Sequence, residues 1–535
     1  MLTTLMERRK IVLLLLIVAM GLSLRLRGLG SAGFNEDEIQ KVEAARSYLN
    51  GNLSVNLEHP MLMKSLIAAS LSAADIWNRR FGKSHPVPEE ASVRLPNVIF
   101  GSLTAVVIFL LAQELFGVEI GLFSAFLWSI SIIAIMVNRV AKEDTLLAFF
   151  TWLAYYFYLR AKRVSATDAQ TGGSFYCAAG ASFGLMLASK YFPHYMGLNA
   201  LYHHWRGRTT SSTPLGKRDY VLFLGSCAVV FVLFNPVVLL PSTLDYMFHY
   251  MRGASITHHG YLMMGRLYSD EMSRLSGGMP VYFYALFLAI KTPLPILGAL
   301  IVGLVTTWKR RREPGPSFVL FMFLWWIVPF SIVGGKFLRY MLAWMPAVCI
   351  IAAIGLVGIF SWLFEMARRR IDGRLAPALV ATVALALAVN PVWAAVKSSY
   401  YSLYLNALGF HRTAYYFPHD EMNDMGLREA IRRISEEAPY GARVGGEAGP
   451  IFKYYFHKLG RDDLRYFNLS DQAKKEDASP SAFLVVQEGR KYFENISFIE
   501  RVESYQAPIH TVEIGGAAAA RIYRGEQLAE LRAGR

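Results

Sequence analysis

Long runs without acidic or basic residues dominate the first three quarters of the chain. A helix needs about 20 apolar residues to cross the roughly 30 Å hydrocarbon layer of a bilayer. Eleven runs free of Asp, Glu, Lys and Arg are candidates: Ile11–Ser23, Leu95–Gln113, Ile120–Asn138, Thr145–Leu159, Ala169–Ser189, Tyr191–Trp205, Tyr220–Leu244, Thr292–Trp308, Gly315–Gly335, Met341–Phe364 and Leu375–Val396. The pattern predicts an α-helical polytopic membrane protein with about 11 transmembrane helices.

The first run could be a signal peptide, because Arg8, Arg9 and Lys10 precede its apolar stretch. No small-residue cleavage site follows it, however, and Arg25 and Arg27 come first. We therefore expect a retained first helix.

Basic clusters alternate with the apolar runs, and Lys/Arg-rich short loops stay in the cytoplasm. With a cytoplasmic N-terminus, every cluster falls on that side: Arg8–Lys10, Arg160–Arg163, Arg206–Arg218, Lys309–Arg312 and Arg368–Arg374. Only 18% of the residues are charged and 54% are hydrophobic, so the net charge of +15 is interpreted as a topology signal rather than a nucleic-acid footprint. The residues after Lys397 are then extracytoplasmic.

The pattern changes in this C-terminal tail. Gly426–Glu437 has helical spacing, whereas Ala482–Val486, Thr511–Ile514 and Ala519–Tyr523 have the composition of short strands. We expect two domains, a transmembrane domain over residues 1–396 and a small extracytoplasmic α/β domain over residues 397–535.

An acidic cluster occurs in the first outside segment, where Asn35 precedes Glu36, Asp37 and Glu38. Asn35 can cap a helix whose first turn carries the acids, and Ile39–Leu49 can continue it as an amphipathic helix on the membrane. This arrangement would aim the carboxylates at the membrane surface, where they could also act in catalysis.

Isolated cations border the apolar runs on the same face. Lys64 fits a snorkelling lysine, and Arg94 fits an interface anchor, but either could also meet an anionic group at headgroup depth. Lys291 interrupts an apolar stretch, where a lysine is costly and usually paired. Arg339 and Tyr340 lie in another short outside turn.

The loop Asn138–Asp144 adds Arg139 and Lys142 and a second acidic pair to this face. Because the loop is short, its charges should stay near the first acidic cluster. Two acidic pairs and several fixed cations suit a base for a hydroxyl group and clamps for a phosphate leaving group.

These segments resemble the motifs of a known family. Phe34–Glu38 resembles the first-loop Asp-Glu motif of the membrane-embedded glycosyltransferases of the GT-C superfamily. His59–Lys64 resembles the His-Pro-Pro-Leu-x-Lys segment of protein O-mannosyltransferases, with Met61 in place of the second proline. Further similar segments are Arg94–Asn97, Leu115–Gly117, Asn138–Phe150, Tyr282–Pro295 and Arg339–Pro346.

The resemblance is to bacterial protein O-mannosyltransferase-like enzymes of glycosyltransferase family 39 and to aminoarabinose lipid A transferases. The Asp245–Met279 loop is too short for the additional domain of the eukaryotic mannosyltransferases, which favours a bacterial-type enzyme in the inner membrane. The GT-C fold is therefore expected, with interfacial helices in the first outside loop.

The resemblance implies an inverting transfer of a sugar from a polyprenyl-phosphate carrier to an extracytoplasmic hydroxyl or phosphate. A protein Ser/Thr, lipid A or a polysaccharide could be the acceptor. In this family the general base would be Asp37, with Glu38 and Asp144 orienting it or completing the acidic site. The donor phosphate would be bound by residues chosen from Lys64, Arg94, Lys291 and Arg339, and further site candidates are His59, Arg139 and Tyr340.

No Gly-rich phosphate loop occurs, consistent with a lipid-linked rather than a nucleotide-linked sugar. Asp37, Glu38 and Asp144 could hold a divalent ion, although basic clamps would make one unnecessary. The alternative class is a transporter or flippase for a lipid-linked or anionic molecule. Its expected broken helices and repeated halves are matched only by Lys291–Pro293.

Overall fold

The computed structural model describes residues 2–165, 167–191, 216–251, 259–272, 277–370, 375–471 and 482–525. Most of these residues form helices, and a small sheet follows near the C-terminus. The predicted combination of an α-helical membrane part and a C-terminal α/β region is confirmed.

Helices occupy the predicted apolar runs wherever the structure describes them. They are α1 (Leu2–Leu26), α4 (Glu89–Phe116), α5 (Val118–Ile130), α6 (Ile132–Asn138), α7 (Asp144–Val164), α8 (Ala169–Ser189), α10 (Lys217–Phe234), α13 (Leu294–Lys309), α14 (Pro314–Ile332), α15 (Met345–Arg370) and α16 (Ala376–Lys397). All but the first residue of the predicted run Tyr191–Trp205 lies outside the described residues.

Among the described residues, four helices are long and apolar enough to cross a membrane, namely α4, α14, α15 and α16. A fifth span results if α5 and α6, which meet at an angle of 57°, count as one. The chain is thus a multi-pass membrane protein by length and composition, and the count of eleven spans stays a prediction.

The predicted orientation of the helices in the membrane can be tested with reporter fusions. Reporters fused after Arg374 and after Tyr400 should lie on opposite sides of the membrane, because α16 connects the two positions. Alkaline phosphatase should be active only at the second position and a cytoplasmic fluorescent reporter only at the first. Two fusions on the same side would contradict the eleven-helix topology.

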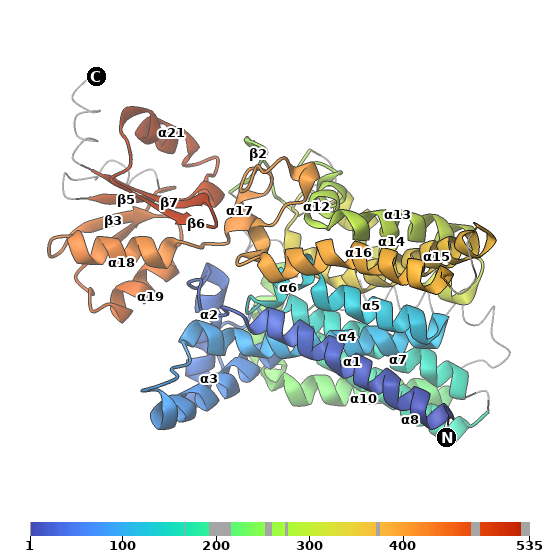
Figure 1. Ribbon diagram of the computed structural model, residues 1–535. Coiled ribbons are helices and arrows are strands. Elements are labelled where there is room, and N and C mark those ends of the chain that lie inside the picture. The colour runs from blue at the N-terminus through green and yellow to red at the C-terminus, as the bar shows by residue number, and fades with distance from the viewer. Residues whose placement is uncertain are drawn as a thin grey trace.

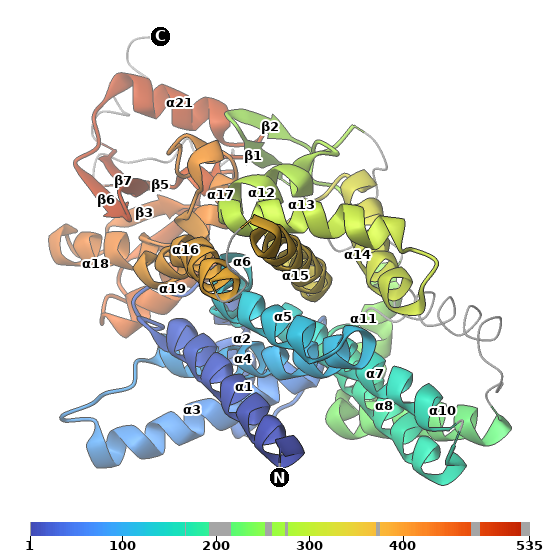
Figure 2. The same ribbon diagram turned by 45° about the vertical axis from the view of Figure 1, so that its right-hand side comes forward.

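The long helices lie roughly side by side, with α1, α4, α5, α7, α8 and α10 on one side and α13 to α16 on the other (Figure 1). Two further helices, α2 (Glu36–Leu49) and α3 (Met61–Phe81), lie at the end of the bundle opposite the start of α1. Figure 2 shows the C-terminal sheet at that same end. The first outside loop and the C-terminal region therefore share one end of the molecule.

The predicted cap at Asn35 is present. Its side-chain oxygen accepts a hydrogen bond from the Glu38 amide at 3.0 Å, and the Glu38 carboxylate accepts one from the Asn35 amide at 3.1 Å. This reciprocal capping box starts α2 at Glu36, so the three acids occupy the first turn. In α3, Pro60 occupies the N-cap position.

The C-terminal sheet contains β3 (Arg443–Gly446), β4 (Arg465–Asn468), β5 (Phe483–Val486), β6 (His510–Ile514) and β7 (Ala517–Arg524). The strand order is β4-β3-β5-β7-β6, and β3 runs parallel to β4 and β5 whereas β7 is antiparallel to both neighbours. One face carries α18 (Leu427–Glu437) and α19 (Gly449–Lys458), and the other carries α21 (Ile496–Tyr505) (Figure 1).

A connecting segment, residues 398–425, contains η3 (Tyr401–Leu403), η4 (Ala407–Gly409) and α17 (Pro418–Met422). It packs at one end of the membrane part, against the hairpin β1 (Tyr261–Met263) and β2 (Arg266–Tyr268), α12 (Phe283–Lys291) and η2 (Leu338–Ala343). The helix α11 (Pro241–Met251) contacts the short helix η1 (Pro236–Leu239) that follows α10. The Asn406 side chain donates to the carbonyls of Ala289 and Thr292, both at 2.6 Å. This segment is therefore fixed to the membrane helices, although it follows the last of them.

Candidate active site

A buried ion pair fixes the first outside loop to the membrane part. Arg94, near the start of α4, donates from Nε and Nη2 to the two Glu38 carboxylate oxygens at 2.8 and 2.7 Å. Its remaining N–H groups donate to the carbonyls of Leu29, Ala32 and Gly33 at 2.7–3.0 Å. All five donors of the guanidinium are thus used.

The hydrogen-bond acceptors of the Glu38 carboxylate are likewise all occupied. Besides Arg94, its carboxylate accepts from the amides of Asn35 and Ala141 at 3.1 and 2.9 Å, and its side chain is fully buried. The pair joins the loop before α2, the helix α4 and the loop before α7. Glu38 and Arg94 therefore hold the site together and keep no free hydrogen-bonding group for a substrate in this structure.

A cavity of about 120 Å³ opens beside this pair. The first outside loop, the Arg139–Lys142 loop, η2 and the connecting segment form its walls. Four basic and two acidic side chains line it, namely Arg94, Arg139, Lys142, Arg339, Asp37 and Asp420. An excess of cations in a concave site suits an anionic ligand such as a phosphate.

Asp37 is the acid of the first loop that reaches this cavity, with 42% of its side chain exposed. Its carboxylate contacts the Lys142 ammonium group, whose side chain is 8% exposed. Burial alone would raise the pKa of Asp37, but Lys142, Arg339 and Lys41 hold it well below its usual range. Burial lowers the pKa of Lys142 to about 8, against the opposing effect of Asp37. Asp37 is therefore a solvent-accessible carboxylate that is ionised at neutral pH.

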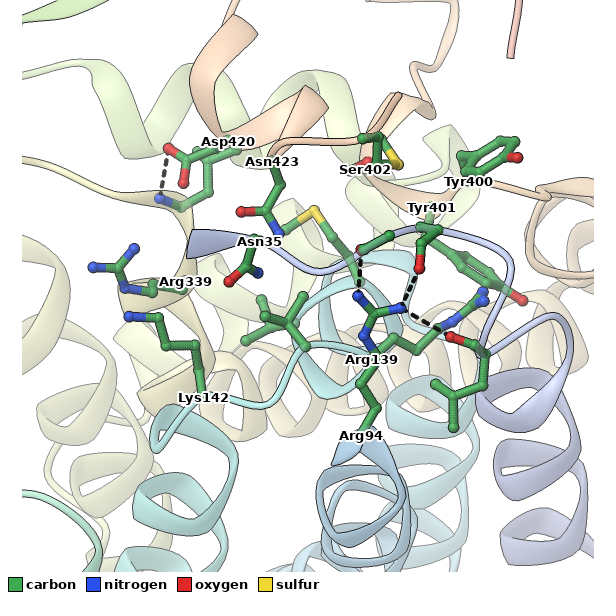
Figure 3. A pocket seen from close by; sticks show the side chains of 18 of the residues that line it. Asn35, Arg94, Arg139, Lys142, Arg339, Tyr400, Tyr401, Ser402, Asp420 and Asn423 are labelled. Atoms are coloured by element: carbon green, nitrogen blue, oxygen red, sulfur yellow. Dashed lines mark hydrogen bonds between the residues drawn. The ribbon is translucent and has the colours of Figure 1, made fainter. Parts of the chain in front are cut away.

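Arg339 lies at the same end of the cavity as Lys142 (Figure 3). Its guanidinium stacks over the Phe337 and Tyr340 rings at 4.4 and 5.4 Å, and its Nε is 3.9 Å from Asp144. Among the described residues, no side-chain hydrogen bond uses its N–H groups, since 3.9 Å is too long for one. Of the predicted phosphate ligands, Arg339 thus faces the cavity with donors available.

Asp144 begins α7 behind this wall and does not line the cavity. Lys190 donates to its Oδ1 at 2.8 Å and stacks over the Tyr340 ring at 5.2 Å. Tyr340 therefore supports both Arg339 and Lys190, while Asp144 compensates their charge.

Lys64 and His59 belong to a neighbouring buried cluster. Lys64 donates to the carbonyls of Asn56 and His59, the latter at 2.8 Å. His59 lies 3.9 Å from Glu143, which pairs with Lys41 at 3.1 Å. Burial lowers the pKa of Lys64 to about 7 and that of His59 to about 4. The cluster adjoins the loop that carries Lys142 but does not line the cavity.

Lys291 ends α12 and does not line the cavity, with 1% of its side chain exposed. It pairs with Glu421 of α17 and donates to the Ser402 carbonyl at 2.6 Å. A lysine in an apolar surrounding usually pairs with a carboxylate in this way. It fixes the connecting segment and leaves Lys291 with buried protein partners.

Arg139 closes the opposite end of the cavity, beside Tyr400 and Tyr401 (Figure 3). It donates to the Gly28 carbonyl at 2.7 Å and lies over the Tyr401 ring at 5.2 Å. No carboxylate is paired with it among the described residues. The cavity therefore has an acid-containing end at Asp37 and a purely basic end at Arg139.

The three acids considered as metal ligands have different cationic partners: Asp37 contacts Lys142, Glu38 binds Arg94, and Asp144 binds Lys190. Within the part of the chain that the structure describes, no group of three His, Cys, Asp or Glu side chains could hold a metal ion.

Seven residues of the connecting segment line the cavity and were not expected there, and Asp420 and Asn423 are the two that α17 and its C-terminal end contribute. Asp420 accepts hydrogen bonds from the Tyr261 hydroxyl and from the Leu338 amide at 3.2 Å, and Asn423 lines the cavity nearby. No sequence motif surrounds Asp420 and Asn423, so their position after the last membrane helix is the one sequence feature that could have indicated a role in the site. Lys142 had a better signal, since it shares a very short loop with Arg139.

Solved structures show which known fold the chain shares. The chain superposes on ArnT from Cupriavidus metallidurans, crystallised with undecaprenyl phosphate, with a TM-score of 0.53, 14% identity and coverage of 96% of this chain and 97% of that chain. For the Archaeoglobus fulgidus oligosaccharyltransferase in its apo form, the TM-score is 0.52 at 12% identity, with 89% and 69% covered. The chain thus shares the fold of these two proteins, in agreement with the fold that the resemblance implied.

A narrower match lies within the membrane part. Residues 87–239 match the family of dolichyl-phosphate-mannose-protein mannosyltransferases. No curated protein matches the chain. The matched segment begins just before α4 and includes Arg94, Arg139 and Lys142, so it contributes one side of the cavity.

Proposed function

We propose that this protein transfers a sugar from a polyprenyl-phosphate-linked donor to a hydroxyl or phosphate of an acceptor outside the cytoplasm. The observation that carries the proposal is the partly exposed carboxylate of Asp37 beside Lys142, in a cavity with excess positive charge. The crystal structure of ArnT with undecaprenyl phosphate supports a lipid phosphate as the carrier. The cytoplasmic N-terminus and the bacterial inner membrane follow from the charge pattern and the resemblance.

In this mechanism Asp37 is the general base. The acceptor oxygen attacks the anomeric carbon, its proton passes to the Asp37 carboxylate, and the bond between that carbon and the phosphate oxygen breaks. The electron pair leaves with the polyprenyl phosphate. Attack from the side opposite the phosphate inverts the anomeric configuration.

The leaving phosphate binds to Arg339 and Lys142 at the acid-containing end of the cavity. These two cations also depress the pKa of Asp37. A phosphate bound between them offsets their charge and raises the basicity of Asp37. The carboxylate is therefore a weak base in the free protein and a stronger one once the donor is bound.

The other predicted ligands have different parts in the proposal. Lys64 holds the turn before α3 and is fully buried, so it would reach the phosphate only if that turn moved. Arg94 and Lys291 act through their carboxylate partners, Glu38 and Glu421. Glu38 and Asp144 orient the loops on either side of Asp37.

Product release tests the proposal directly. Purified protein incubated with polyprenyl-phosphate-linked sugars from its own host membrane should release polyprenyl phosphate when envelope material is added as acceptor. Mass spectrometry of envelope glycans and lipids, from a deletion strain and the wild type, then identifies sugar and acceptor. A transporter would move the donor without releasing the phosphate, and that outcome would refute the transferase.

The binding step should depend on pH in a defined direction. Because Lys142 has a pKa of about 8, raising the pH from 7 to 9.5 should weaken undecaprenyl phosphate binding, by up to about tenfold per pH unit above 8. A phosphate monoester is already doubly ionised above pH 7, so the protein causes the change. Lys142→Arg stays charged and should remove most of the decrease in titrations in lipid nanodiscs. An equal decrease in both proteins would assign it to another group, with Lys64 next.

A further inference from the structure

The first outside loop, residues 28–38, is held from two sides. Arg94 binds it from the membrane part, as described above. From the opposite side, the Tyr455 hydroxyl of α19 accepts a hydrogen bond from the Phe34 amide at 2.9 Å. The Asp424 carboxylate accepts one from the Glu36 amide at 3.2 Å.

Arg490, at the end of η5 (Glu488–Arg490), completes the outer side. It donates from Nε and Nη2 to the two Asp424 oxygens at 2.8 and 2.6 Å, and its Nη1 is 3.0 Å from the Glu36 carboxylate. The Asp424 side chain is 3% exposed. Burial would raise the pKa of Asp424, but Arg490 lowers it overall, so the carboxylate stays ionised and able to accept the Glu36 amide.

The first turn of a helix has amide groups without partners inside the helix. In α2, Asn35 caps the Glu38 amide, but the Glu36 amide has its acceptor in Asp424, outside the helix. Asp37 lies between Glu36, bound by Arg490, and Glu38, bound by Arg94. The backbone of the proposed base is thus fixed by two arginines from different parts of the chain.

We propose that Arg490 is a positioning residue and that the C-terminal sheet region completes the active site by fixing the first turn of α2. The inference rests on the proposed role of Asp37 and gives the C-terminal region a part in catalysis. Without Arg490, the buried Asp424 loses its counter-charge, the turn at Glu36 loosens, and the Asp37 carboxylate moves from the attacking oxygen. A misplacement of about 1 Å can cost about 100-fold in rate.

Hydrogen–deuterium exchange of the full-length protein in lipid nanodiscs, resolved to single amides, measures directly how firmly Arg490 holds the first turn of α2. Arg490→Ala should accelerate exchange at the Glu36 amide by at least about tenfold, because exchange reports the opening of that hydrogen bond. The Asn35 amide, which donates to Glu38 inside the capping box, should change much less. Wild-type exchange at Glu36 would overturn the proposal.

Two further variants separate positioning from a general loss of structure. Arg461→Ala removes an equivalent fork to Asp463, with bonds of 2.8 and 3.0 Å, that lies within the C-terminal region and does not contact the first loop. It should leave exchange at Glu36 unchanged, and equal acceleration by both alanine variants would refute the specific role of Arg490. Tyr455→Phe removes only a hydroxyl and should accelerate exchange at the Phe34 amide.

Kinetics provide the second readout. Arg490→Ala should lower kcat by about tenfold to a hundredfold while the affinity for undecaprenyl phosphate stays within about twofold, because the cavity cations are untouched. Arg490→Lys should recover part of kcat. Accelerated exchange with unchanged kcat would overturn the positioning role. If Asp37→Asn instead keeps normal turnover, the proposed function fails, whereas the exchange result at Glu36 stands independently.

Discussion

Replacing Asp37 by Asn is expected to lower turnover by at least ~100-fold, the lower end of the effect of losing a general base. The substitution keeps the size of the side chain and removes its proton-accepting charge. Undecaprenyl phosphate should still bind, because Arg339 and Lys142 remain, and Lys142 no longer shares its charge with a carboxylate. Sugar transfer and lipid binding should be measured on the same preparation.

Asp75→Asn is the matched control, since this acid is exposed on α3 and far from the cavity walls. It should have wild-type turnover. If Asp37→Asn also turns over near the normal rate, Asp37 is not the base, and Asp420 is the remaining acid that lines the cavity.

Replacing Arg94 by Ala should have the largest effect on stability. Glu38 would become a buried carboxylate without a counter-charge, and three backbone carbonyls would lose their donor. Removing one member of a buried ion pair costs about 3–5 kcal/mol. Arg94→Lys should recover little, because a lysine supplies three donors from a single nitrogen. Unfolding in detergent, followed by tryptophan fluorescence, measures the difference.

The double variant Arg94→Ala with Glu38→Gln should be more stable than Arg94→Ala alone, because the uncompensated charge is gone. Arg27→Ala is the control, since Arg27 is exposed and donates to a single carbonyl, that of Val396. A stable Arg94→Ala protein with weakened undecaprenyl phosphate binding would show instead that Arg94 leaves Glu38 to bind the donor. That outcome would restore the role implied by the family resemblance.

The elements of this fold follow closely from local sequence. Apolar runs set the helices, Asn35 and Glu38 form the predicted capping box, and β5, β6 and β7 match three expected strands. The strands β3 and β4 were missed, because β3 is a short Arg443–Gly446 segment with two glycines and β4 lacks an alternating pattern. Short strands depend on neighbours in the sheet rather than on their own composition.

The candidate site is harder to predict from local sequence, because the role of a charged side chain depends on the partner that the fold gives it. Glu38 and Arg94 are 56 residues apart, and Lys291 and Glu421 are 130 apart. Local sequence shows that such residues are present on one face but not which cations are already paired. Pairing is what separates the available Arg339 from the saturated Arg94. Asp420 shows the same limit, since it reaches the cavity through the fold of a segment without any motif.

The first loop is held both by the membrane part and by the C-terminal sheet region, so its contacts are completed only late in biosynthesis. Phe34 and its acceptor Tyr455 are 421 residues apart. At roughly 5–20 residues per second, translation needs roughly 20–80 s to span that interval. Throughout this time the first loop of a nascent chain lacks the contacts from Tyr455 and Arg490. If Asp37 is the base, incomplete chains should therefore turn over slowly, and full activity should begin only when the C-terminal sheet region has packed against the first loop.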